Sequence, residues 1–128
     1  MRFDGLRVMR DPTRGGTATV LCEFAEKKPF GIELDETRIP IAPGAAAACG
    51  LLGLDPLYCA SEGRIAAVIS GECAEEAVRE LRKTSGGGDA CVIGSVTAAH
   101  PGYVTVRTRI GGSRVLTKLS GAQLPRIC

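Results

Sequence analysis

The order of hydrophobic patterns along the chain limits the fold more than any other feature of this sequence. Apolar residues at helical spacing over residues 17–28 are followed by an alternating, strand-like segment at residues 30–35. The alanine-rich run 43–52 again indicates a helix, because Pro43 suits a first helical turn and Gly53 suits a C-cap. Helices and strands therefore alternate through the first half of the chain.

The second half continues the alternation and ends in strands. Residues 64–70 form a short run rich in β-branched side chains, which predicts a buried strand. Residues 75–83 carry apolar side chains on one face and charges on the other, which is typical of a surface helix. The Gly111-Gly112 pair predicts a two-residue hairpin turn. Further strands are predicted at residues 91–96, 103–110 and 113–118.

This order predicts an α/β (α+β) domain in which a mixed sheet is packed with helices in layers. The length of 128 residues suits one domain. Seventeen glycines and seven prolines against five aromatic residues indicate many tight turns and a core of small aliphatic side chains. We expect the domain to span residues 1–119 and a flexible C-terminal tail to span residues 120–128.

Charge and hydropathy exclude two classes of partner. The 16 basic and 14 acidic residues are interspersed, so no basic patch for nucleic acid is expected. No apolar run approaches the roughly 20 residues that span a membrane, and the N-terminus lacks the apolar stretch of a signal peptide. The sequence therefore predicts a soluble, cytoplasmic protein.

The six cysteines are spread over the chain without the close spacing of a zinc or redox pair, so no metal site is expected. Cys22, Cys49 and Cys91 lie in apolar stretches, where free cysteine behaves as a small hydrophobic residue. We expect these three thiols to be buried and reduced.

The segment before the first helix is a candidate phosphate site. The backbone amides of Gly15 and Gly16, at the positive end of a helix, could bind phosphate, and Arg14 could grip it with two hydrogen bonds. A structural interpretation is equally open. Asp11 or Thr13 could cap the helix, and the glycines could allow close packing.

Glu62 is a candidate catalytic residue. It lies in the sequence Ser-Glu-Gly-Arg before a predicted strand, where its carboxylate would face a crevice at the sheet edge. A simple turn that starts the strand is an open alternative.

Cys128 is a candidate reactive thiol at the end of a nine-residue arm, in which Pro125 favours an extended course of about 30 Å. A thiol on such an arm could travel to a partner and return. The adjacent terminal carboxylate would oppose its ionisation, whereas Arg126 would favour it. The alternative is an accidental cysteine on a frayed end.

Taken together, these motifs resemble a known family. The chain from about Arg7 onward is similar to the C-terminal domain of the HypE family of nickel–iron hydrogenase maturation proteins, within the aminoimidazole ribonucleotide synthetase superfamily. Members of that superfamily phosphorylate a carbonyl or amide oxygen with ATP. The motifs that carry the resemblance are residues 9–16, 53–58, 61–63, 107–112 and the terminal Gln-Leu-Pro-Arg-Ile-Cys of residues 123–128.

The resemblance implies specific chemistry. Cys128 would receive a carbamoyl group from the carbamoyltransferase HypF, and ATP would drive its dehydration to a thiocyanate. The cyanide would then pass to iron on the HypC–HypD complex. Glu62 would be the base that removes an N–H proton. The phosphate end of the ATP site would be lined by Asp11, Thr13, Arg14, Gly15 and Gly16.

One departure from the family is large. The family's N-terminal domain, which binds ATP and magnesium and forms the homodimer, has no counterpart in this sequence. We therefore expect ATP and magnesium to bind mainly through that domain, and this chain alone to be inactive. Two other functions are possible. One is an ATP-dependent small-molecule kinase or synthetase domain of the same superfamily, and the other is a non-catalytic docking module for maturation partners.

Overall fold

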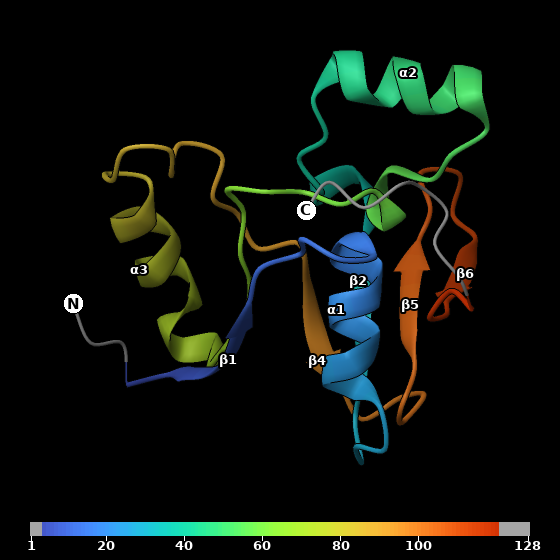
Figure 1. Cartoon of the computed structure of the whole chain (residues 1–128). Coiled ribbons are helices and arrows are strands. Elements are labelled where there is room, and N and C mark those ends of the chain that lie inside the picture. Colours follow the sequence, from blue (N-terminus) through green and yellow to red (C-terminus); the bar gives the residue numbers. More distant parts are fainter. Residues whose placement is uncertain (1–3, 121–128) are drawn as a thin grey trace.

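A computed structural model describes residues 4–120 of the chain, so the predicted tail after Ser120 lies outside the described residues. The described part contains helices and strands in alternation (Figure 1). In chain order they are β1 (Leu6–Arg10), α1 (Gly16–Ala25), β2 (Gly31–Asp35), η1 (Glu36–Arg38), α2 (Pro43–Leu52), η2 (Pro56–Tyr58), β3 (Ala66–Ile69), α3 (Gly71–Leu81), β4 (Gly94–Thr97), β5 (Val104–Arg107) and β6 (Ser113–Leu116).

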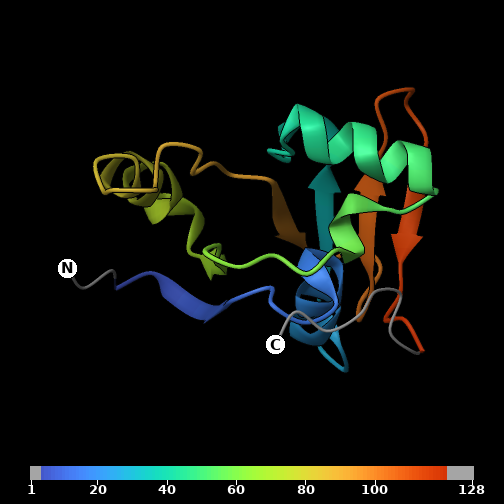
Figure 2. The same cartoon turned by 45° about the horizontal axis from the view of Figure 1, so that its top comes forward.

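The strands form two sheets. The main sheet has the order β4-β2-β5-β6, with β2 and β5 parallel and the other pairs antiparallel. The smaller sheet is an antiparallel ribbon of β1 and β3. Helix α1 lies along the main sheet, whereas the ribbon and α3 lie to one side of it (Figures 1 and 2). The predicted α/β class with a mixed sheet is confirmed.

The core lies between α1 and the main sheet, and it consists of small aliphatic side chains plus one aromatic ring. The Cys22 thiol is buried there and donates a hydrogen bond to the Leu116 carbonyl at 3.5 Å, while burial raises its pKa. The prediction of a buried thiol is confirmed for Cys22 but not for Cys49 and Cys91, which are only half-buried. The core includes Ala18, Val20, Leu21, Phe24, Ala25, Ile32, Leu34, Val104, Val106 and Leu116.

The helices agree with the sequence predictions. α2 begins at Pro43 and ends at Leu52, and Gly53 caps it in the left-handed conformation, with φ of 67°. α3 is the predicted amphipathic helix, although it starts at Gly71 and buries only Ala77. No helix among residues 4–120 is long and apolar enough to cross a membrane.

Two strand predictions need correction. The segment at residues 64–70 is not a buried strand, because β3 pairs only with β1 in the ribbon and Ile65 is 57% exposed. β1 is not predicted from the sequence, and its side chains are all exposed, including those of Leu6, Val8 and Met9. The predicted strand at residues 91–96 starts later, at Gly94.

The β5–β6 hairpin is confirmed, but its turn is longer than two residues. The connection runs over residues 108–112, and the Thr108 amide donates to the Gly112 carbonyl at 2.7 Å. Gly111 has φ of 90°, so it supplies the positive φ that closes this wider loop. A second anchor is the Arg109 amide, which donates to the Glu36 carboxylate at 2.9 Å.

Candidate functional site

The segment before α1 does not use a side chain to cap the helix. Gly15 occupies the N-cap position with φ of 68°, and no side chain accepts a hydrogen bond from the first turn. The Thr13 hydroxyl instead donates to the Asp11 carboxylate at 2.8 Å, and this bond lowers the pKa of Asp11. The suggestion that Asp11 or Thr13 caps the helix is therefore wrong. Arg14 is exposed beside the uncapped turn.

Gly16 is where α1 meets η2. A Cβ at Gly16 would lie 2.3 Å from the Leu57 carbonyl oxygen and 2.7 Å from the Cys59 carbonyl oxygen. Its φ of 68° is also unfavourable for other residues. The close-packing role suggested for these glycines is confirmed at Gly16.

Hydrogen bonds and one ion pair fix η2 on the other side of this contact. The Asp55 carboxylate accepts from the Leu57 amide at 3.0 Å and pairs with Arg114 at 2.7 Å. The Tyr58 hydroxyl donates to the Thr117 carbonyl at 2.8 Å and accepts from the Thr117 amide at 3.1 Å. These contacts hold η2 to β6 and the segment that follows it, so the loop leading to β3 leaves from a fixed point.

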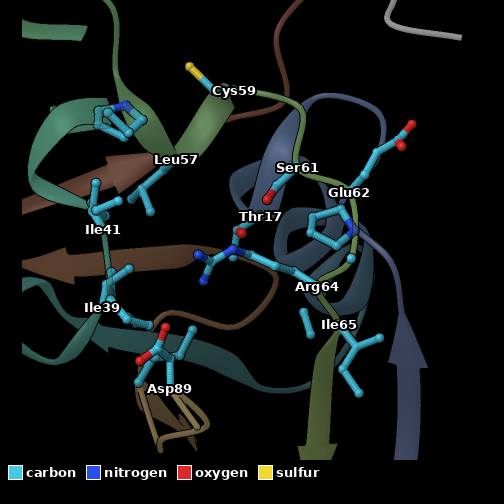
Figure 3. Close-up of a pocket in the computed structure, with 18 of the residues that line it drawn as sticks. Thr17, Ile39, Ile41, Leu57, Cys59, Ser61, Glu62, Arg64, Ile65 and Asp89 are labelled. Carbon is cyan, nitrogen blue, oxygen red and sulfur yellow. The ribbon is translucent and has the colours of Figure 1, made fainter. Parts of the chain in front are cut away.

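The two loops singled out from the sequence lie side by side. The Ser61 amide donates to the Pro12 carbonyl at 3.0 Å, and Pro12 is fully buried. A pocket of about 550 Å³ opens along this junction (Figure 3). Its lining includes Thr17, Ile39, Ile41, Cys49, Leu57, Cys59, Ser61, Glu62, Arg64, Ile65 and Asp89.

Among the predicted site residues, Glu62 lines this pocket. The predicted phosphate loop contributes to the lining only through Pro12 and its neighbour Thr17. The residues predicted to bind phosphate are not among the lining residues: Asp11, Thr13, Arg14, Gly15 and Gly16. Cys128 lies outside the described residues.

The sequence alone does not single out Thr17, Arg64 and Asp89 as pocket residues. In Figure 3 the Arg64 side chain extends across the pocket below Thr17, while the Glu62 carboxylate extends in a different direction. Arg64 could have been suspected, because it follows Glu62 by two residues. No sequence pattern predicts that Asp89 lines this pocket, since it lies in a glycine-rich turn far along the chain.

The pocket has a mixed electrostatic character. Arg64 and Asp89 contribute opposite charges to its lining, and the Thr17 and Ser61 hydroxyls lie near the Arg64 side chain. Glu62 also lines the pocket, but its carboxylate points in another direction. Such a lining can bind a polar ligand that carries both donors and acceptors. Among residues 4–120 no group of three or more His, Cys, Asp or Glu side chains is arranged to hold a metal ion.

Comparison with known proteins identifies the fold around this pocket. A family model described as AIR synthase related protein, C-terminal domain, matches residues 2–107. The chain belongs to this AIR synthase related family. The family resemblance inferred from the sequence motifs is thereby confirmed.

Within the AIR synthase related family, the chain is similar to hydrogenase maturation proteins. It is 48% identical over 124 residues to the carbamoyl dehydratase HypE of Bradyrhizobium diazoefficiens, covering 97% of this chain and 36% of that protein. A crystal structure of HypE in complex with ATP matches with a TM-score of 0.88 and 42% identity, covering 97% of this chain and 38% of that one. A HypE–HypF complex matches with a TM-score of 0.84 and 34% identity, over 91% and 37% of the two chains. This chain therefore spans little more than a third of the length of these relatives.

Proposed function

We propose that this chain is the part of a carbamoyl dehydratase that carries the acceptor thiol and the catalytic base in nickel–iron hydrogenase maturation. The observation that carries the proposal is the position of Glu62. Its loop is held against the segment before α1 and lines a pocket of about 550 Å³. The 48% identity to a carbamoyl dehydratase over 97% of the chain supports the same assignment.

The proposed reaction starts at Cys128. Its thiolate attacks the carbonyl carbon of an activated carbamoyl group delivered by a HypF-type carbamoyltransferase, expels the activating group and becomes an S-carboxamide. Hydroxide is a poor leaving group, so the amide oxygen is first phosphorylated by ATP and then leaves as phosphate. The two N–H protons must also leave, and Glu62 accepts one of them as the C≡N bond forms. The cyano group of the thiocyanate then passes to iron on the HypC–HypD complex, where two electrons supplied by that acceptor complex release Cys128 as a thiolate and leave cyanide on the iron.

The segment before α1 suits the phosphate end of ATP. No acidic residue lies in the first turn of α1 and no side chain caps it, so no side chain competes with an anion for the positive helix end. In this proposal Arg14 adds a charge-assisted hydrogen bond, while Gly15 and Gly16 let the backbone approach closely. The Asp11–Thr13 hydrogen bond keeps this loop in shape.

In the part of the chain that the structure describes, no three or more His, Cys, Asp or Glu side chains are grouped so that they could hold a metal ion. We propose that magnesium, much of the ATP site and the homodimer interface belong to the remaining length of the relatives. It follows that the 128-residue chain alone should not produce thiocyanate.

Mass spectrometry of the full-length protein tests the assignment of Cys128. After incubation with HypF, carbamoyl phosphate and ATP, the wild type should gain a carbamoyl group and then lose one water. Cys128→Ala should show neither change, whereas Cys91→Ala, which alters a half-buried thiol, should behave like the wild type. An adduct that persists in Cys128→Ala contradicts the proposal.

The two alternative functions give other results in this experiment. A small-molecule kinase or synthetase would consume ATP without needing Cys128. A docking module would bind HypF even after loss of both Glu62 and Cys128. The docking alternative has one observation in its favour, because α2 buries none of its residues and Leu51 is 90% exposed.

A further inference from the structure

Two thiols meet on the wall of the pocket. Cys49 lies in the last turns of α2, and Cys59 directly follows η2. Their sulfur atoms are 3.7 Å apart, both residues are half-buried, and both line the pocket that contains Glu62. Figure 3 shows Cys59 at one edge of the pocket. Cys59 lies ten positions after Cys49 in the sequence, so the turn between α2 and η2 brings the two thiols into contact.

We propose that Cys49 and Cys59 are a redox-modification site that forms a reversible intramolecular disulfide by exchange with a small soluble disulfide of the glutathione class. This site goes beyond the proposed function, because it uses neither Cys128 nor ATP. A disulfide here would staple α2 to η2 on one wall of the pocket.

The exchange balances in two steps. The thiolate of one cysteine attacks the small disulfide, forming a mixed disulfide and releasing one thiolate of the reagent. The second cysteine then loses its proton and attacks the protein sulfur of the mixed disulfide, which releases the second reagent thiolate. The protein loses two hydrogens and two electrons, and the reagent is reduced to two thiols.

The local structure permits the bond to close. A disulfide sulfur pair is about 2.05 Å apart, so the two sulfur atoms must approach by about 1.7 Å. α2 has no buried residue that resists a small shift, and the space around its C-cap Gly53 is open, since a Cβ there would meet no atom within 4 Å. The helix can therefore move toward η2, which is itself fixed by the Asp55 and Tyr58 contacts.

The contact also makes the second step fast relative to the first. Two thiols already 3.7 Å apart react intramolecularly, so the mixed disulfide should not accumulate. Burial and the neighbouring Cys49 thiol raise the pKa of Cys59, which makes thiolate scarce near neutral pH. The thiol–disulfide exchange should accordingly be followed in mildly alkaline buffer, at about pH 8.5.

The experiment uses the 128-residue chain with Cys128→Ala, so that the terminal thiol cannot take part. After incubation with oxidised glutathione, the protein is digested with trypsin without reduction. The peptide of residues 39–64 contains Cys49 and Cys59 and no other cysteine. We expect this peptide to lose two hydrogens, and dithiothreitol to restore them.

Single variants in the same background separate a pair from two independent thiols. Cys49→Ser and Cys59→Ser should each abolish the two-hydrogen loss and leave a glutathione adduct on the remaining cysteine. Cys91→Ser is the matched control, because Cys91 is a half-buried cysteine of the same pocket whose thiol donates to the Arg38 carbonyl at 3.4 Å. It should retain the two-hydrogen loss. Accumulation of glutathione on the 39–64 peptide without that loss overturns the proposal.

Amide hydrogen exchange tests whether the disulfide restrains α2 against η2. In the oxidised protein the amides of residues 46–52 should exchange at least about tenfold more slowly than in the reduced protein, because α2 can no longer move away from η2. Unchanged amide exchange in α2 would contradict this restraint of the helix by the disulfide. Since HypF and ATP are absent from these experiments, their outcome is independent of the proposed dehydration.

Discussion

At the scale of single residues, Gly16 makes the contact that joins α1 to η2. A methyl group there would meet backbone oxygen, which cannot rotate away as a side chain can. We predict that Gly16→Ala lowers the free energy of unfolding by about 2–4 kcal/mol, because it combines this clash with a left-handed backbone. Urea denaturation followed by circular dichroism measures the change.

Gly50→Ala is the matched control for this prediction. Gly50 lies within α2, a Cβ there would meet no atom within 4 Å, and its φ is not positive. Its replacement should leave stability unchanged or raise it by up to about 1 kcal/mol, since alanine favours helix. Equal stability of Gly16→Ala and the wild type would show that the α1–η2 contact is not as described.

The sequence could not decide between the roles open to the glycines of this loop. A phosphate-binding role and a packing role both require glycine, and the packing role of Gly16 depends on the Leu57 carbonyl, 41 residues further along the chain. Side-chain capping was equally plausible for Asp11 and Thr13. Their mutual hydrogen bond, which satisfies Thr13 without the helix, becomes visible only in three dimensions.

At the scale of elements, the parallel strands β2 and β5 bring their C-terminal ends together. Asp35 pairs in register with Arg107, and their side chains form an ion pair at 2.7 Å. The Thr37 hydroxyl and amide also donate to the Asp35 carboxylate, at 2.6 and 2.9 Å. The Thr37 bonds and the Arg107 guanidinium lower the pKa of Asp35 from 3.8 to about 2.

This lowered pKa predicts a defined pH dependence. In the unfolded chain Asp35 takes up its proton near pH 3.8, but in the folded chain it does so only near pH 2. Its stabilising contribution is therefore complete above about pH 4 and is lost as the pH falls toward 2.

We accordingly expect Asp35→Asn to be less stable than the wild type at neutral pH, and the difference to shrink between pH 4 and pH 2. Urea denaturation of both proteins across this range measures the difference. A difference that stays constant through the range would rule out the ionised Asp35 as its source. Glu33→Gln, an exposed residue of the same strand, serves as the control.

The elements that could be predicted are those set by local signals. The bounds of α2 follow from the sequence because Pro43 and Gly53 mark its two ends. The ribbon strand β1 is defined by its pairing with β3, far along the chain, and the length of the β5–β6 turn depends on the Thr108 hydrogen bonds rather than on its two glycines. Strand pairing and turn length are set by contacts distant in sequence, which local patterns do not record.

At the scale of the whole molecule, motifs give the family and Glu62, but not the pocket around it. The pocket joins the segment before α1, the loop before β3 and the turn that contains Asp89. These three segments are far apart in the sequence, and only the fold brings them together. The chain matches little more than a third of the relatives' length. This partial match is the reason for proposing that magnesium and the homodimer interface belong to the remaining length of the relatives.

The role of Glu62 is the central claim, and one measurement tests it most directly. Full-length wild type and Glu62→Gln are incubated with HypF, carbamoyl phosphate and ATP, and the mass of the C-terminal peptide is followed over time. Glu76→Gln, which changes an exposed carboxylate of α3, is the control.

We predict that all three proteins acquire the carbamoyl group at Cys128. The subsequent loss of water should be at least about 100-fold slower in Glu62→Gln, as expected when a general base is removed, and unchanged in Glu76→Gln. Thiocyanate formation by Glu62→Gln at the wild-type rate would contradict the account.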